Sequence, residues 1–334
     1  MSFQNLFYFL LFHFLTVNVL AQRPNITVAL DGTGDFRSIA EAVRVIPNNS
    51  DSIFYVYVKA GKYFENIYID GEKRNIIMYG DGIGKTNIIS SRSNSTGYSI
   101  GESAALNIDS SFFIAKDMSI INNAGPDGQQ AVALRTAGDY IVCLRCSIEG
   151  FQDTLYAHRG KSQFFFKCDI FGTIDFIFGD ARMIVQNSII HVRRPSDGQQ
   201  NMITADGRHD ATLNTAIVGS IIPTPELSQS NVKTYLGRLW KRFARTIIMQ
   251  SYLDKFIDPE GWAKFSDKTD VTTLYYAEFW NYGPGSNTSG RVKWPVYHAL
   301  NNPDDVQDFL VKNFIDENDW LSKFDVPFFP GLVK

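Results

Sequence analysis

The sequence contains little cysteine, almost no net charge and no apolar run of the length that an ordinary membrane span needs. Three cysteines in 334 residues leave at least one thiol unpaired, so no disulfide framework holds the fold. The formal net charge of −3 gives no general attraction for nucleic acid or an anionic membrane, and we expect neither as a partner. With 44% hydrophobic and 20% charged residues, the chain is nevertheless that of a globular protein.

Two of the cysteines, Cys143 and Cys146, lie in the strand-like run "CLRC". Because side chains alternate between the two faces of a strand, we expect these two to point to opposite faces and not to bind one metal ion. No histidine pair supplies the missing ligands. The sequence therefore predicts no metal site, and no motif in it calls for a cofactor.

The N-terminal segment differs from the rest of the chain. "LFYFLLFHFLTVNVLA" is apolar over about 16 residues, which is short for a membrane span, and it ends in small residues that suit cleavage. It has no Lys or Arg, and a buried helix or a membrane anchor is the alternative. We expect a secretory signal over residues 1–21 and one domain over 22–334. Four N-x-S/T sequons agree with export and are candidate glycosylation sites: Asn25, Asn48, Asn94 and Asn287.

Short β-like runs recur through the middle of the chain: "AKDMSII", "CLRCSIE", "FFKCDIF" and "IVQNSII". Their matching isoleucines are Ile120, Ile148, Ile170 and Ile189, at intervals of 28, 22 and 19 residues. Such a period favours a solenoid of parallel strands, and no helical pattern between the runs indicates βαβ units. A β-sandwich would need tight hairpin signals, which are few. The sequence predicts an all-β parallel β-helix.

Helical patterns are expected near both ends of this solenoid: the first would close its N-terminal end, and the second would pack along it. The first, "FRSIAEAVRVIP", has apolar residues at helical spacing, with Ser38 and Glu41 at the capping-box spacing. The second, "NPDDVQDFLVKNFI", begins with Pro303 and acidic residues. Its apolar face consists of Val306, Phe309, Leu310 and Phe314.

The same period places four polar residues together. Gln130, Gln152, Asp153 and Asp175 are separated by 22, 1 and 22 residues. In a parallel β-helix, positions one coil apart stack about 4.8 Å apart, so Asp153 should lie beside Asp175, and Gln130 one coil before Gln152. Two carboxylates that close do not ionise together easily, so one pKa should rise while the other stays low. This arrangement suits an acid and a nucleophile.

A close carboxylate pair serves two reactions. Retaining glycosidases use carboxylates about 5 Å apart, and an ester hydrolase could use the same pair if a group stabilised a tetrahedral oxyanion. Two side-chain amides beside the pair favour the ester hydrolase, because they can donate to an oxyanion. The alternative is a hydrogen-bonded ladder of Gln and Asp side chains that only holds the coils together.

Residues around the pair fit this chemistry. Arg238, in "TYLGRLWK", can hold Asp175 ionised through a bidentate guanidinium, and Trp240 suits stacking on a sugar ring. Phe176, Phe178 and Tyr156 would exclude water. "GYSIG" imitates an esterase elbow at Ser99, but it lies in a polar segment and not at a strand–turn–helix elbow. "GDGIGKT" imitates a phosphate loop but lacks its first glycine, and we expect a turn there.

Eight segments in this order resemble the plant-type pectin methylesterase family: "DGTGDFRSIAEAV", "VYVKAGKYFENI", "GDGIGKT", "AGPDGQQAVALR", "GFQDTLYAH", "GTIDFIFGDA", "TYLGRLWK" and "TLYYAEFWNYGPG". The resemblance runs from about residue 27 to 332. It implies a right-handed parallel β-helix and hydrolysis of the methyl ester at C6 of galacturonate in pectin, which gives methanol and pectate. It further implies a secreted cell-wall enzyme without a cofactor, and we expect a monomer.

The resemblance also implies roles for single residues. Asp175 is expected to be the nucleophile, and Asp153 to protonate the leaving methanol and then activate water. Gln130 and Gln152 are expected to form the oxyanion hole, and Arg238 to hold the nucleophile.

The aromatic residues expected to bind the substrate are Trp240, Trp262, Tyr156 and Phe178. A proteinaceous pectinesterase inhibitor is a further candidate partner. Since few residues separate the expected signal from the domain, we expect no inhibitor-like pro-region.

Departures from the family pattern leave an alternative function open. Leu239 replaces a usual Pro and should loosen the turn that carries Arg238. Asp206 stands where Gln is common, and Asp180 where Asn is common, so extra acids near the cleft should repel a polyanion. "HRGKSQFF" is one residue longer than usual. The rivals are therefore an impaired paralogue that binds pectate or a regulatory protein, and a pectin-cleaving glycosidase or lyase.

Overall fold

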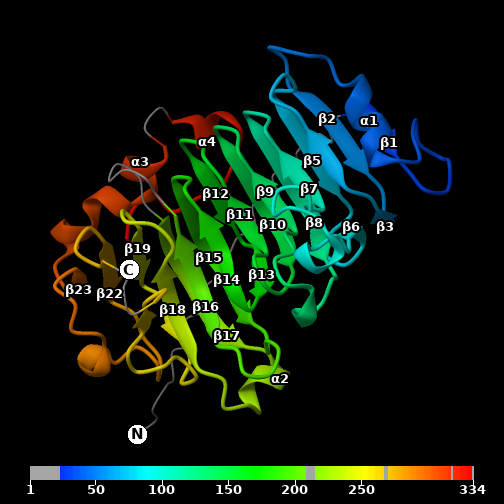
Figure 1. The fold of residues 1–334 in the computed structure, drawn as a ribbon. Coiled ribbons are helices and arrows are strands. Elements are labelled where there is room, and N and C mark those ends of the chain that lie inside the picture. Colours follow the sequence, from blue (N-terminus) through cyan, green and yellow to red (C-terminus); the bar gives the residue numbers. More distant parts are fainter. Residues whose placement is uncertain (1–22, 208–214, 267–269, 317–318, 333–334) are drawn as a thin grey trace, which may run out of the picture.

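The computed structural model describes residues 23–207, 215–266, 270–316 and 319–332, and the expected signal segment 1–21 lies outside them. Every strand pairing in this part of the chain is parallel, and successive coils stack into one elongated solenoid (Figure 1). The protein is a right-handed parallel β-helix, which confirms the predicted fold.

The larger sheet follows the order β1-β2-β5-β8-β10-β12-β15-β17-β19-β22-β23, with β3, β6, β13 and β20 pairing alongside this path. Its strands are β1 Ile26–Val28, β2 Phe54–Val58, β3 Gly61–Phe64, β5 Ile76–Gly80, β6 Thr86–Ser90, β8 Phe113–Asn122, β10 Ile141–Glu149, β12 Gln163–Phe166, β13 Asp169–Gly172, β15 Met183–Val192, β17 Thr215–Pro223, β19 Arg245–Met249, β20 Tyr252–Leu253, β22 Tyr275–Phe279 and β23 Tyr297–Leu300.

The smaller sheet receives one short strand from each successive coil and carries the candidate site. Its order is β21-β18-β16-β14-β11-β9-β7-β4. Its strands are β4 Ile67–Ile69, β7 Leu106–Ile108, β9 Leu134–Thr136, β11 Leu155–Ala157, β14 Ile174–Gly179, β16 Asn201–Asp206, β18 Thr234–Leu239 and β21 Trp262–Ala263.

The predicted isoleucine stack is correct for three coils and wrong for the fourth. Ile120, Ile148 and Ile170 pair across β8, β10 and β13, but the next member is Ile190. Ile190 is fully buried, whereas Ile189 is 39% exposed. The interval from Ile170 to the next core position is therefore 20 residues, one more than the sequence comparison of the runs predicted.

Left-handed residues turn the long strands at one corner of the solenoid. Asp117, Arg145, Lys167 and Asn187 have φ of 56°, 51°, 53° and 51° and follow one another coil by coil. Three of them lie within the strands β8, β10 and β15, and Lys167 lies in the break between β12 and β13. A residue in this conformation interrupts the alternation of inward and outward side chains.

This interruption overturns the prediction for the two close cysteines. Arg145 lies between Cys143 and Cys146, so both side chains point into the same core, where Cys168 joins them. All three thiols are free and buried. Among the described residues, no group of three ligand side chains is placed to hold a metal ion.

The N-terminal helix forms where the pattern predicted it. Helix α1 spans Ile39–Val45, and the Ser38 hydroxyl accepts a hydrogen bond from the Glu41 backbone N–H. The Glu65 carboxylate accepts from the backbone N–H groups of Ile39 and Ala40, at 3.0 and 2.9 Å. An acid from a neighbouring coil therefore completes the cap.

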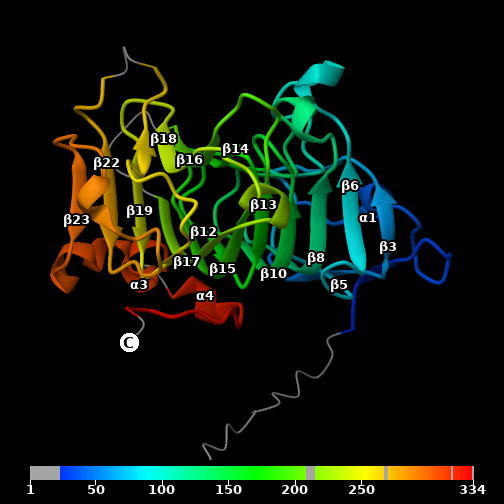
Figure 2. The ribbon, with the colours of Figure 1, turned by 90° about the horizontal axis from the view of Figure 1, so that it is seen from below.

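The C-terminal helix is broken, contrary to the prediction of one continuous element. A 3-10 helix, η4 Pro303–Phe309, and helix α3 Val311–Phe314 are separated by Leu310, whose ψ of 143° is extended. The expected apolar residues are all buried and pack, with α4 Trp320–Lys323, on the outer face of the larger sheet (Figure 2). The remaining short helices are η1 Asn94–Thr96, η2 Pro126–Gly128, α2 Pro225–Ser228 and η3 Thr288–Gly290.

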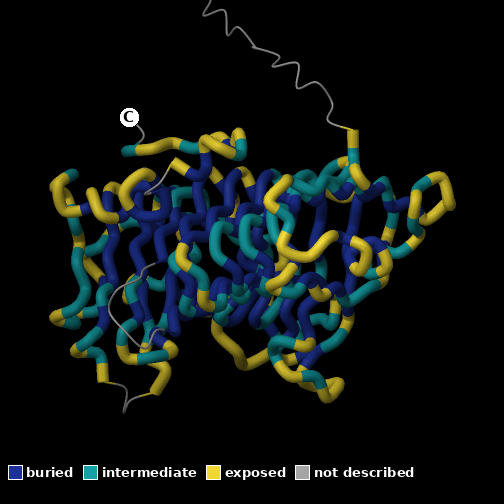
Figure 3. Tube along the Cα trace, turned by 90° about the horizontal axis from the view of Figure 1, so that it is seen from above, coloured by how far each residue is buried: buried dark blue, intermediate teal, exposed yellow. Residues whose placement is uncertain are grey.

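Most of the core lies inside the solenoid, and the exposed residues concentrate in the loops (Figure 3). In the last coils the core contains a buried ion pair: Arg291 Nε donates to Glu278 Oε1 at 2.8 Å, and both residues are at most 2% exposed. None of the described helices has the length and apolarity to span a membrane.

Candidate active site

A cavity of about 140 Å³ opens on the outer face of the smaller sheet. It is lined by Ile100, Gln130, Gln152, Asp153, Asp175, Phe178, Ala205, Arg238, Trp240 and Phe265. These residues come from successive coils and are far apart in the sequence. The structure therefore brings both predicted aspartates, both predicted glutamines and the predicted arginine to one place.

The two aspartates lie on neighbouring coils, as their spacing predicted. The Asp153 backbone N–H donates to the Ile174 carbonyl oxygen at 3.0 Å, which in a parallel ladder places Asp153 opposite Asp175. The same offset continues in the pairing of Tyr156 with Phe178. Both aspartates are left-handed, with φ of 64° and 51°, a conformation that Asp tolerates better than most residues.

Arg238 holds Asp175 in a bidentate ion pair. Its Nε donates to Oδ1 at 2.8 Å and its Nη2 donates to Oδ2 at 2.6 Å. The strand register explains how the Arg238 side chain reaches Asp175. Arg238 pairs with Ala205 of β16, which pairs with Phe178 of β14. The small Ala205 side chain leaves room for the guanidinium to cross one coil. Asp175 lies in an irregularity of β14, where the pairing with β16 shifts.

Burial raises the pKa of both carboxyl groups. The pKa of Asp153 is raised well above its ordinary value, first by burial and then by the charge of Asp175. Burial also raises the pKa of Asp175, against the hydrogen bonds and charge of Arg238, which lower it. The expectation that the second pKa stays low is therefore wrong. Because the guanidinium binds only Asp175, Asp153 is the carboxyl group that is more readily protonated.

The two glutamine side chains are available for a ligand. The Ala131 backbone N–H donates to the Gln152 carbonyl oxygen at 3.1 Å, which places Gln130 beside Gln152 on the preceding coil. Among the described residues, neither side-chain amide has a hydrogen-bond partner, and both line the cavity. A ladder of mutually bonded polar side chains is therefore not present here.

Aromatic side chains form one wall of the cavity. The Tyr156 and Phe178 rings stack at 4.5 Å and 7°, and the Trp240 ring meets Phe178 edge-on at 6.0 Å. Trp240 also lies against the backbone of Gly207, where a Cβ atom would come within 2.1 Å of the indole. Tyr156 does not line the cavity itself but supports Phe178.

The prediction that Trp262 lines the cleft is wrong. Trp262 is 1% exposed and stacks inside the solenoid on Tyr276 at 4.3 Å. The register gives the reason: Ala263 pairs with the outward-facing Arg238, so Trp262 points inward. The aromatic residue missed by the sequence analysis is Phe265, which lines the cavity, with the Arg238 guanidinium 4.6 Å from its ring centroid. Its segment, "AKFSDK", carries no signal of this position.

Two of the four departures from the family pattern, Leu239 and Asp206, do not face the cavity. Leu239 is the last residue of β18 and is 3% exposed in the main core, so it is not in a turn. Asp206 is also 3% exposed, and its Oδ2 accepts from the Arg245 backbone N–H at 3.1 Å. It pairs in register with Leu239, so it points inward.

The third departure, Asp180, lies beside the aromatic wall. Its Oδ1 lies 2.9 Å from Nδ1 of His158, which also contacts the Tyr156 hydroxyl at 3.1 Å. Bonds from His158 and the Arg159 backbone N–H lower the pKa of Asp180 to about 2, against the effect of burial. This acid is therefore ionised and partnered.

Outside the cavity, the structure bears on two further sequence features. The four sequon asparagines, Asn25, Asn48, Asn94 and Asn287, are all exposed. The Ser99 hydroxyl donates to Glu102 at 2.6 Å, and no histidine contacts it among the described residues.

Comparisons with known proteins agree on one family. The sequence model described as "Pectinesterase" matches residues 25–318. "Pectinesterase 2" of Citrus sinensis is 46% identical over 315 residues, which is 93% of this chain and 61% of that protein. "Probable pectinesterase/pectinesterase inhibitor 7" of Arabidopsis thaliana is 44% identical over 317 residues, 92% of this chain and 54% of that protein. The chain thus spans little more than half the length of these relatives.

Solved structures give the same result. The pectin methylesterase from carrot superposes with a TM-score of 0.91 at 39% identity, covering 93% of this chain and 99% of that one. The pectin methylesterase from Aspergillus niger has a TM-score of 0.76 at 28% identity, covering 89% and 97%.

Proposed function

Since this chain belongs to the pectinesterase family, we propose that it hydrolyses the C6 methyl ester of galacturonate in pectin, giving methanol and pectate. The observation that carries the proposal is the bidentate Arg238–Asp175 pair beside the buried Asp153, in one cavity with two unpartnered amides. An ion-paired carboxylate, an acid and two donors are the groups that ester hydrolysis needs.

In the first half of the reaction, an ionised Asp175 oxygen attacks the ester carbonyl carbon. The tetrahedral oxyanion accepts hydrogen bonds from the amides of Gln130 and Gln152. As the intermediate collapses, the bond to the methoxy oxygen breaks and Asp153 gives its proton to that oxygen, so methanol leaves neutral. The product is an acyl anhydride on Asp175.

In the second half, Asp153 is ionised and takes a proton from water, whose oxygen attacks the anhydride carbonyl carbon. The bond to Asp175 breaks, so Asp175 is an ionised carboxylate again, and Asp153 keeps the proton that it took from water. The pectin carboxylic acid that is released loses its proton to the solvent and becomes pectate. The raised pKa of Asp153 supports both halves, because a buried carboxyl group that holds its proton more firmly than usual can give it to the methoxy oxygen and then take one from water. Arg238 keeps Asp175 ionised and oriented throughout.

The aromatic wall supports a sugar substrate. Phe178, Trp240 and Phe265 present ring faces and edges to the cavity, and Trp240 is 38% exposed. Pyranose rings carry apolar C–H faces that pack on aromatic rings, while the hydroxyl groups stay in water. We expect these residues to bind the sugars on either side of the scissile ester.

The setting of this activity is also part of the proposal. The apolar segment 1–21 and the four exposed sequons support secretion to the cell wall and glycosylation at Asn25, Asn48, Asn94 and Asn287. We also propose that the protein acts as a monomer without a cofactor. A proteinaceous inhibitor that covers the cleft remains a candidate partner.

The test is methanol release from highly methylated pectin by the purified chain, with polymer length followed in parallel. Asp175→Asn and Asp153→Asn should each abolish methanol release while the protein stays folded. Asp117→Asn is the matched control, because Asp117 is also left-handed and bound to an arginine but lies outside the cavity. Methanol release by either site variant at the wild-type rate would refute the mechanism. Shortened polymer would instead indicate a glycosidase or lyase. Binding of pectate without methanol release would indicate an impaired paralogue.

A further inference from the structure

A second hollow, of about 480 Å³, lies at a corner of the larger sheet, where β15 and β17 bend. We call it the corner hollow. The residues that matter for its chemistry are Asn187, Ile189, Ser220, Gln250, Tyr282 and Phe329. It includes no residue of the smaller sheet, so it is separate from the candidate active site.

Stacking of successive coils builds the corner hollow. Ile189 pairs with Ser220, Ser220 with Tyr252, and Tyr252 with Tyr282. Neighbouring members of this row are about 4.8 Å apart, as neighbouring strands are. The row crosses several coils, so the surface suits a linear chain of units more than a single small molecule.

The far side of the corner hollow comes from the C-terminal segment. Gln186 fixes Phe329 there with two hydrogen bonds: its Nε2 donates to the Phe329 carbonyl oxygen at 2.9 Å, and its Oε1 accepts from the Phe329 N–H at 2.8 Å. The Phe329 ring also packs against Phe166, with centroids 6.0 Å apart. This aromatic side chain is therefore held in place before any ligand arrives.

The corner hollow exposes apolar surface beside uncharged polar groups. Tyr282 is 57% exposed, Phe329 43% and Ile189 39%. Asn187 is exposed, and neither its amide nor the Ser220 hydroxyl has a side-chain hydrogen bond among the described residues. An amide both donates and accepts, so such a surface can bind hydroxyl groups in either direction.

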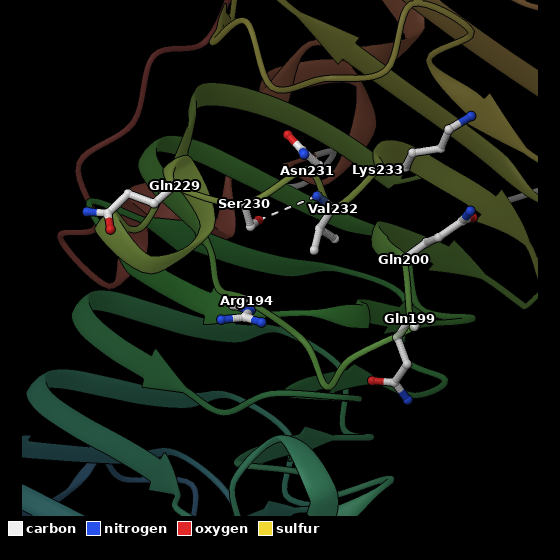
Figure 4. A pocket seen from close by; sticks show the side chains of 9 residues that line it. Arg194, Gln199, Gln200, Gln229, Ser230, Asn231, Val232 and Lys233 are labelled. Atoms are coloured by element: carbon white, nitrogen blue, oxygen red, sulfur yellow. Dashed lines mark hydrogen bonds between the residues drawn. The ribbon is translucent and has the colours of Figure 1, made fainter.

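The corner hollow differs from another hollow on the molecule in the charge of the residues that line it. Among the described residues that line the corner hollow, none is charged. The other hollow, shown in Figure 4, is lined by Arg194 and Lys233 together with several amides. A carboxylated polymer needs cations, so it would fit that hollow and not the corner hollow. Exposed rings with neutral donors and acceptors fit a polymer that has apolar ring faces, hydroxyl groups and no charge.

We propose that the corner hollow binds a segment of uncharged polysaccharide, with pyranose rings packed on Tyr282 and Phe329 and hydroxyl groups bound by Asn187 and Ser220. The occupant that we propose is a neutral glycan, because a galacturonan gains carboxylates wherever it loses its esters and the residues described around the corner hollow offer no cation to bind them. The surface would hold the protein on a wall polymer while the cavity on the smaller sheet remains free. The binding does not depend on the proposed esterase activity.

The test measures binding of three hexasaccharides to the full chain by isothermal titration calorimetry: a neutral glucan, fully methyl-esterified galacturonate and its de-esterified form. Asp175→Asn is the background for the esterified probe, so that the probe is not consumed. We expect the glucan to bind, and Tyr282→Ala or Phe329→Ala to weaken that binding about 5- to 10-fold. Tyr282→Phe, which keeps the ring, should bind like the wild type. Phe64→Ala is the matched control, because Phe64 is 72% exposed and far from both sites in the sequence.

The three probes distinguish the possible results. Binding of the glucan that is weakened in Tyr282→Ala supports the proposal. The proposal is overturned if the glucan does not bind at about 1 mM, whether or not the esterified or de-esterified probe binds. It is also overturned if Trp240→Ala abolishes glucan binding that Tyr282→Ala and Phe329→Ala leave intact. Tyr282→Ala should release methanol at the wild-type rate. The binding proposal and the proposed esterase activity can therefore be refuted independently of each other.

Discussion

Replacing Arg238 by glutamine tests whether its ion pair keeps the nucleophile charged. The variant loses two charge-assisted hydrogen bonds, of 2.8 and 2.6 Å, to a carboxylate whose side chain is only 14% exposed. Hydrogen bonds to charged groups contribute about 1.5–3 kcal/mol, so the preference of Asp175 for its ionised form should weaken by an amount of that order. Only the ionised form attacks, and the rate should fall about 10- to 100-fold at a pH where the wild type is active.

The loss should depend on pH in a definite direction. Without the guanidinium the pKa of Asp175 rises, so the carboxylate is protonated over a wider acid range. The acid limb of the pH–rate profile should move to higher pH, and the deficit should be larger at about pH 5 than at about pH 8. The assay is initial methanol release across this range. Arg145→Gln is the matched control, because Arg145 makes the same bidentate contact with Asp117, at 2.6 and 2.7 Å, outside the cavity.

Two results would contradict this reasoning. If Arg238→Gln retains the wild-type acid limb, the guanidinium does not set the charge of Asp175. If Arg145→Gln loses activity equally, the effect is a general loss of stability. Equal melting temperatures of the two variants make the comparison valid.

Three further predictions concern stability and binding. Asp153→Asn should stabilise the fold by about 0.5–2 kcal/mol at neutral pH. The pKa of Asp153 is raised in the folded protein, so the wild type loses stability as the pH rises through that pKa, whereas the uncharged Asn does not titrate. Urea unfolding should therefore show that the variant is more stable than the wild type at neutral pH but not in acid. Glu278→Ala leaves Arg291 buried without its carboxylate, so it should cost about 3–5 kcal/mol and lower the melting temperature by about 6 °C or more. Gly207→Ala should displace the Trp240 ring and raise KM several-fold with kcat nearly unchanged, as initial rates will show.

Each of these has its own contrary result. The Asp153 prediction fails if the variant gains stability equally in acid and at neutral pH. For the buried ion pair the control is Asp197→Ala, which removes an exposed partner of Arg194 and should leave the melting temperature unchanged. A kcat effect larger than the KM effect in Gly207→Ala would mean that Trp240 acts on the reacting atoms.

The spacing of polar residues was predictable because the solenoid has one dominant constraint. In a parallel β-helix an interval of one coil places two residues side by side whatever lies between them, so the 22 residues from Asp153 to Asp175 were enough. The Arg238 contact was predicted from the chemistry of a bidentate guanidinium and strengthened by the family resemblance, but spacing alone did not give it. Its reach depends on the small Ala205 in the coil between, which no spacing argument identifies.

The errors share a different cause, which is local backbone conformation. The left-handed Arg145 has no sequence signature, yet it decides that Cys143 and Cys146 share a face. The extended Leu310 breaks a helix whose apolar periodicity is intact. Trp262 was placed in the cleft from the family resemblance alone, but a single-residue step along β21 decides whether a side chain points inward or outward.

The structure also weighs against the impaired paralogue, because the fold accommodates each departure that suggested it. Leu239 packs in the core at the end of a strand, where a turn proline would have no role. Asp206 points inward and accepts a backbone hydrogen bond, so its charge does not face the polymer. Asp180 does lie near the cavity, but it is partnered by His158, whose ring supports Tyr156 behind Phe178. The acids that remain to meet the ester are therefore Asp153 and Asp175, and these are the two that the proposed reaction uses.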